Sequence, residues 1–173
     1  MAQLNINIMK RILLILTIVG TLAFHGCTVR EETQIVVLPE VFEVTASFSA
    51  ANNFARLVTL NPPIYSSDMV LVYRLFDVVG GEDVWRSLPQ TVYLSQGELD
   101  YNFDFTRNDI NIFLDSNFDL TTFSATWAQN QTFRIVIIPG YFSNKSNKVV
   151  DFNDYNAVVK AFNINENQIK TLK

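Results

Sequence analysis

The chain has 173 residues, of which 13 are Lys or Arg and 17 are Asp or Glu, so its formal net charge at pH 7 is −4. The acidic excess argues against nucleic acid as a partner, because such binding needs clustered Lys and Arg to replace counterions. The one double glycine, Gly80-Gly81, lacks the strand, GxGxxG spacing and helix of a dinucleotide site, so we expect no nucleotide and no cofactor.

The first 26 residues have the layout of an export signal. Two basic residues precede an apolar run over residues 12–24, which is shorter than the roughly 20 residues that a membrane-spanning helix needs. Cys27, the single cysteine, follows closely. The arrangement resembles a bacterial lipoprotein signal peptide, which implies cleavage before Cys27 and acylation of its thiol and new amino terminus. Phe24 and His25 depart from the family pattern, which usually has Leu and then a small residue at these places.

The stretch after Cys27 resembles a localisation signal. Residues 28–32 include an acidic pair, similar to the export signal that Bacteroidota lipoproteins carry beside the lipidated cysteine. The resemblance implies a small lipoprotein of the Bacteroidota type, anchored in the outer membrane through lipid on Cys27 and exposed at the cell surface, with the periplasmic face as the alternative. A solvated tether would also explain the acids. Met9 could replace Met1 as the start of the same signal.

Cleavage before Cys27 would determine which side chains remain for chemistry. It removes two basic residues and no acid, so the formal charge goes from −4 to −6. It also removes His25, the single histidine, while acylation occupies the single thiol. Zinc sites need Cys and His, and nucleophilic triads need a His or Lys base, so we expect a protein that is not an enzyme. The predicted parts are the signal over 1–26, a lipidated cysteine and tether over 27–40, a domain over 41–162 and a polar tail over 163–173.

The body of the chain has the alternation of β structure. Apolar and polar residues alternate over 42–48, 99–105 and 110–114, as in strands with one buried and one wet face. Further strands are predicted over 54–60, 69–79, 84–94 and 133–138, separated by Gly-rich, Pro-rich and Asn-rich turns. Short strands at this spacing predict an all-β fold, an antiparallel β-sandwich of the immunoglobulin or fibronectin type III kind, with a small β-barrel as the alternative.

The carboxyl end predicts a short helix. Apolar residues recur at helical spacing from Tyr155 to Phe162, and Asp151 or Asn153 could cap the first turn. We expect this helix to pack on its own domain and close one end of the sandwich. Residues from Asn163 onward are polar and are expected to fray.

One loop has the spacing of a weak calcium site. Asp115, Asn117 and Asp119 could present oxygen ligands from a D-x-N-x-D pattern. Leu120 and Thr126 stand where an EF-hand has Gly and Glu, so the pattern is not that motif. An ordinary turn rich in Asx side chains is the competing interpretation.

Aromatic residues make up 13% of the chain, and several lie near predicted turns or loops. These candidates for binding are Tyr65, Trp85, Tyr93, Trp127 and Tyr141. If these rings are exposed together, they could stack on sugar faces or anchor a protein partner. The alternative is that each ring separately fills space at an end of the sandwich.

The sequence therefore favours a non-enzymatic binding or envelope-assembly module that presents a β-sandwich to a glycan or another envelope protein. A carboxylate-dependent hydrolase of envelope polysaccharide and a purely structural subunit are the alternatives. A hydrolase would need two carboxylates about 5 to 10 Å apart across a cleft. An exposed aromatic patch would instead favour binding.

Overall fold

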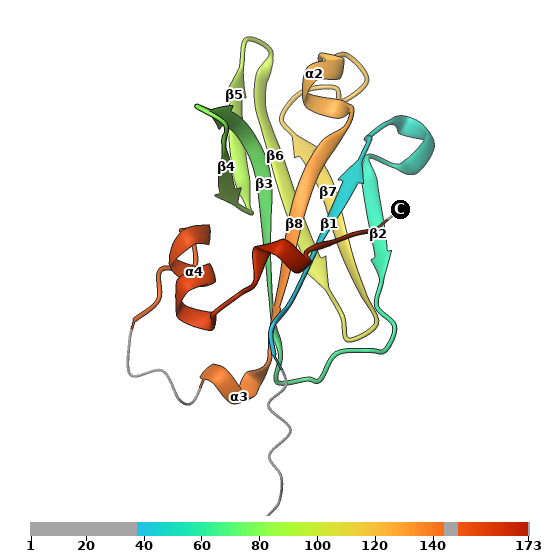
Figure 1. Cartoon of the computed structure of the whole chain (residues 1–173). Coiled ribbons are helices and arrows are strands. Elements are labelled where there is room, and N and C mark those ends of the chain that lie inside the picture. Colours follow the sequence, from blue (N-terminus) through green and yellow to red (C-terminus); the bar gives the residue numbers. More distant parts are fainter. Residues whose placement is uncertain (1–37, 144–148, 173) are drawn as a thin grey trace, which may run out of the picture. The chain divides into compact units, whose positions relative to one another are not determined.

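The structure is a computed structural model that describes residues 38–143 and 149–172. The predicted signal, Cys27 and most of the tether lie outside the described residues. Nine strands form two sheets among the described residues, with strand order β4-β3-β8-β1-β9 in sheet A and β2-β7-β6-β5 in sheet B (Figure 1). The sheets stack face to face and do not close into a barrel, so the predicted β-sandwich with a short helix is confirmed.

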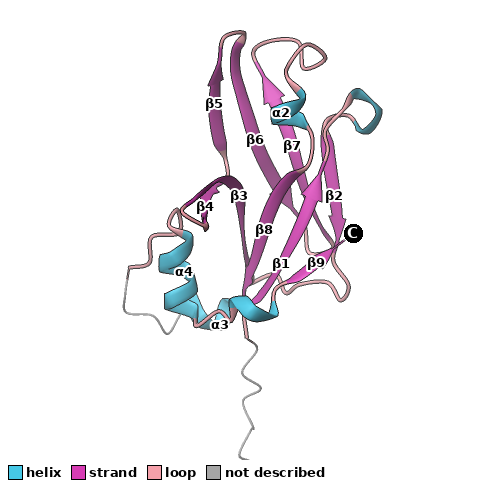
Figure 2. Ribbon diagram, turned by 45° about the horizontal axis from the view of Figure 1, so that its top comes forward, coloured by secondary structure: helices cyan, strands magenta, loops and turns pink. Residues whose placement is uncertain are grey.

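The strands of sheet A are β1 (Glu40–Ala46), β3 (Met69–Val79), β4 (Glu82–Ser87), β8 (Gln131–Ile138) and β9 (Lys170–Leu172). Those of sheet B are β2 (Ala55–Thr59), β5 (Gln90–Leu94), β6 (Gly97–Phe105) and β7 (Asp109–Ser116). The helical elements are η1 (Ala50–Asn52), α2 (Ala125–Ala128), α3 (Gly140–Ser143), α4 (Tyr155–Phe162) and η2 (Glu166–Gln168). The described strand pairs are antiparallel, except that β9 runs parallel to β1 (Figure 2).

The main core fills the space between the two sheets. Alternate residues of most strands, though not of β4 and β9, point inward, which explains the period of two in the sequence. Three aromatic rings, Phe48, Tyr101 and Phe133, contact one another there at centroid distances of 6.0 to 6.3 Å. This core holds the strands that position the surfaces described below.

A second core covers the outer face of sheet A. Tyr73 and Val136 on the sheet pack against Val158 and Phe162 of α4. Because both faces of β3 and β8 are covered, these strands are apolar at both parities, as their sequences indicated. Helix α4 therefore packs on its own domain, as predicted. The expectation that it closes one end of the sandwich is wrong, because its apolar stripe covers the outward-facing apolar residues of sheet A instead.

The predicted strand over 84–94 is wrong in one respect, because it is two strands in different sheets. β4 pairs with β3 in sheet A, and β5 pairs with β6 in sheet B. Pro89 lies between them and has no N–H to donate to a ladder. The backbone N–H of Leu88 instead donates to Val72 O at 2.8 Å, and the chain crosses to the other sheet.

Helix α4 contains the predicted apolar stripe from Tyr155 to Phe162 but has a different cap. Asp154 is the N-cap, and its Oδ1 accepts from the N–H groups of Asn156 at 2.9 Å and Ala157 at 3.3 Å. Neither predicted cap is used: Asp151 accepts from the N–H of Asn153, and Asn153 Oδ1 accepts from the hydroxyl of Ser87 at 3.0 Å. The local competition among three nearby Asx residues decides the cap.

The expectation that residues 163–173 fray is wrong for the described part of this segment. Asn163 ends α4 in the left-handed conformation with φ 52°, and η2 and β9 follow. β9 pairs with β1 from Phe42 to Val44. The edge of β1 offers unpaired backbone N–H and C=O groups. Pairing with this edge orders the three residues of β9, none of which is buried.

Candidate functional site

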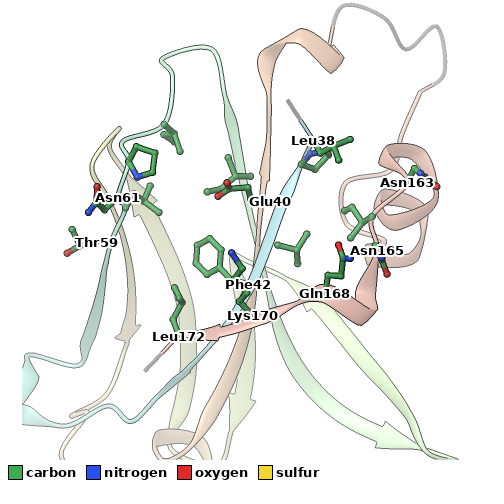
Figure 3. A pocket seen from close by; sticks show the side chains of 17 residues that line it. Leu38, Glu40, Phe42, Thr59, Asn61, Asn163, Asn165, Gln168, Lys170 and Leu172 are labelled. Atoms are coloured by element: carbon green, nitrogen blue, oxygen red, sulfur yellow. The ribbon is translucent and has the colours of Figure 1, made fainter. Parts of the chain in front are cut away.

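A groove of about 520 Å³ lies between the start of β1, the loop after β2 and the segment from α4 to β9 (Figure 3). Its floor is apolar, with Phe42, Leu60, Ile64 and Ile137. Its rim carries amide and charged side chains: Asn61, Asn163, Asn165, Gln168, Glu40 and Lys170. Thr59 and Asn61 line one side, and Asn165 and Gln168 line the other.

Two sheet edges flank this groove. β9 is the last strand of sheet A, and β2 is the last strand of sheet B on the same side. β9 covers only three residues of β1, whereas β8 pairs with seven on its other side. Sheet edges carry backbone N–H and C=O groups that can pair with another strand. The groove therefore combines an apolar floor with backbone edges.

The acids of the groove do not form a hydrolytic pair. Among the described residues that line it, Glu40 is the single carboxylate. Asp100 and Asp115 do lie opposite each other on β6 and β7, but on the outer face of sheet B. A glycosidase needs two carboxylates facing one another across the substrate. Neither arrangement supplies such a cleft.

The weak calcium candidates are held in local turns. Asn117 Oδ1 accepts from the N–H of Glu98 at 2.8 Å, and Asp115 Oδ1 accepts from the next backbone N–H at 2.8 Å. Asp119 Oδ1 accepts from the N–H and the hydroxyl of Thr121, and these two bonds hold the pKa of Asp119 below its usual range. No group of three or more His, Cys, Asp or Glu side chains in the described residues is placed to hold a metal. These contacts favour the Asx-turn interpretation.

Both tryptophans pack against the two apolar cores. The guanidinium of Arg134 lies 4.0 Å from the centroid of the Trp85 ring, and Tyr155 packs on that ring at 5.8 Å. Trp127 packs against the main core, with the guanidinium of Arg74 5.4 Å from its ring. Neither ring is available as a flat binding platform.

Arg74 is a buried cation that the sequence prediction did not single out. Its side chain is 3% exposed and donates from Nε and Nη2 to Gln131 Oε1, at 2.9 and 2.5 Å. Nη1 lies 3.4 Å from Gln90 Oε1, and burial lowers the pKa of Arg74. Gln131 in turn donates to the carbonyls of Thr126 and Gln129. Arg74 therefore fixes the α2 loop over one end of the core, which is a structural role.

Arg134 organises the outer face of sheet A. It bonds Glu43 Oε1 at 2.6 Å and Glu166 Oε1 at 2.9 Å, with Asp83 Oδ2 at 3.9 Å. The hydroxyl of Tyr155 also donates to Glu166, at 3.1 Å. Burial lowers the pKa of Arg134, but the bond to Glu43 and the interactions with Tyr155 together outweigh burial, so the net shift of this pKa is upward. The cluster ties the carboxyl-terminal segment, and with it one wall of the groove, to sheet A.

The remaining aromatic candidates are exposed but separate. Tyr65 is 67% exposed in the loop before β3, Tyr141 is 38% exposed on α3, and Tyr93 is 78% exposed on β5. Tyr65 and Tyr141 lie at the end of the sandwich where β1 begins, whereas Tyr93 lies next to the β5–β6 turn at the opposite end (Figure 1). The five aromatic candidates therefore do not gather into one patch.

In the part of the chain that the structure describes, no helix is long and apolar enough to cross a bilayer. No protein-family model, curated protein or solved structure matches the chain.

Proposed function

We propose that this chain is a lipid-anchored, non-enzymatic module of the bacterial cell envelope whose groove binds an extended segment of a partner protein. The observation that carries the proposal is the groove between two sheet edges, with an apolar floor and an amide rim. An added strand would satisfy edge backbone groups, while its alternate side chains would fill the floor.

The lining favours a polypeptide over a glycan. Phe42 is the single aromatic residue among the described residues of the lining, and it is only 8% exposed. Sugar recognition benefits from an exposed aromatic face, which this lining does not offer. Amide side chains such as Asn165 and Gln168 can instead bond the peptide groups of an extended chain. A single lining carboxylate, Glu40, gives the hydrolase alternative no support.

Binding in the groove is tested with charge placed on its rim. Thr59 and Gln168 are exposed on opposite sides, so the Thr59→Arg, Gln168→Arg double variant is expected to fold. It should weaken capture of the partner protein about tenfold or more, because uncompensated charges oppose an apolar segment. The matched control is Thr45→Arg with Ser95→Arg, which adds the same charge at exposed positions outside the groove.

The assay uses the chain from Thr28 onward in a pulldown and on a glycan array. Partner capture that the groove variant loses and the control variant keeps is the expected result. Glycan binding without protein capture, or equal capture by both variants, would overturn the proposed ligand. No binding to anything would favour the purely structural subunit.

The anchor is tested separately at Cys27. Cys27→Ser should abolish acyl labelling and release the protein from the membrane fraction, because the thiol is the proposed acylation site. Two acyl signals give stable anchoring, so the loss should be nearly complete. Persistent membrane association with unchanged acyl labelling would contradict the lipid anchor at Cys27. It would leave the result on partner binding in the groove unaffected.

A further inference from the structure

Several connections meet at one end of the sandwich, which we call the proximal end. β1 and β3 begin there and β8 ends there, because Glu40 and Met69 pair with the last two residues of β8. Asp68 joins two loops at this end: its Oδ2 accepts from the N–H of Tyr65 at 2.9 Å and its Oδ1 from the N–H of Gly140 at 3.2 Å. In Figure 1 the proximal end is the lower one, beside α3.

The proximal end exposes large apolar side chains. Leu38 is 66% exposed, Tyr65 is 67% exposed and Tyr141 is 38% exposed. Pro62 and Pro63 are exposed in the same loop as Tyr65. Tyrosine rings are favoured at membrane interfaces, since the ring is apolar and the hydroxyl reaches water and headgroups. These side chains carry no charge, so their contact with lipid would not depend on anionic headgroups.

The chain between the anchor and the domain is short. Ten residues, 28–37, join Cys27 to Leu38, and fully extended they reach about 35 Å. Their attachment point is Leu38, which itself belongs to the proximal end. An acylated Cys27 therefore keeps these exposed side chains within a few tens of ångströms of the bilayer.

We infer that the proximal end rests on the lipid surface, with Leu38, Tyr65 and Tyr141 at the level of the headgroups. The inference rests on the lipid anchor at Cys27 of the proposed function. It sets the orientation of the domain, with the far turns around α2 pointing away from the membrane. The groove, which Leu38 also lines, then opens beside the membrane surface.

The test couples the chain from Cys27 onward through its single thiol to a maleimide lipid in phosphatidylcholine nanodiscs that contain a gadolinium-chelating lipid. Amide NMR signals of residues 65–68 and 140–141 should broaden more than those of the β5–β6 turn. Tyr65→Ser with Tyr141→Ser should reduce that broadening at least about twofold, because membrane contact scales with the apolar area buried. Tyr93→Ser, at an exposed ring on β5, should leave it unchanged.

Equal broadening at both ends would overturn the inference. So would unchanged broadening in the double serine variant, because the short tether alone would then explain proximity. Matching thermal midpoints for the parent and double variant would show that the fold is intact. Since chemical coupling imposes the anchor, the outcome does not depend on native acylation, and failure of the Cys27→Ser experiment is distinguishable from failure here.

Discussion

Replacing Arg134 by Met is expected to lower the free energy of unfolding by about 2 to 3 kcal/mol. The substitution leaves Glu43 and Glu166 without their shared cation and removes the guanidinium from the Trp85 ring. The expected loss is below the range for fully buried pairs, because the two carboxylate side chains are 24% and 48% exposed. The carboxyl-terminal segment should loosen first, because Glu166 loses its contact with sheet A.

Urea unfolding measures the loss, and hydrogen exchange locates it. Amides of η2 and β9 should exchange faster in Arg134→Met than in the parent. Lys160→Met is the matched control, since it removes the same charge at an exposed position of α4. If both variants unfold at the same urea concentration, the Arg134 cluster does not stabilise the fold.

Raising the pH from 10 to 12 is expected to destabilise the protein steeply. Burial raises the pKa of Tyr101 to about 12 from its ordinary value of 10.0, although the nearby Arg74 opposes the shift. Burial also raises the pKa values of Tyr73 and Tyr155. A raised folded-state pKa stabilises the fold below the unfolded pKa, and that stabilisation is lost as the pH rises through the folded pKa. Tyr101 alone should account for about 2 kcal/mol over this range.

The check is the slope of unfolding free energy against pH. Tyr101→Phe loses the hydroxyl bond to the Trp127 carbonyl, which should cost about 1 kcal/mol at neutral pH, but it should flatten the alkaline slope. Tyr93→Phe, at an exposed ring, should keep the parent slope. An unchanged slope in Tyr101→Phe would mean that this tyrosine ionises equally in both states.

The strand pattern was predictable because a strand with one buried face has apolar residues at every second position. Leu99 and Tyr101 point into the core as the alternation indicated, β3 has the predicted bounds, and α4 contains the predicted apolar stripe. The split between β4 and β5 was missed because a strand that changes sheets keeps the same local pattern on both sides of Pro89. The β-sandwich itself followed from the number and spacing of strands.

The groove could not be predicted, because its parts are far apart in the sequence. β9 is ordered by the open edge of β1, and none of its three residues is buried. The roles of Trp85 and Trp127 could not be predicted from the sequence either, because each ring packs against an arginine that is distant in the sequence. Arg74 and Arg134, each inside an otherwise apolar run, were the available signal for those contacts.

The most direct measurement of the groove's function is photocrosslinking in intact cells. A benzoylphenylalanine in place of Gln168 should form an adduct with another polypeptide, mapped to one extended segment of it. The same probe in place of Thr45, exposed on β1 outside the groove, should not form that adduct. Equal adducts from both positions, or none from Gln168 in correctly localised protein, would contradict the groove as the binding site.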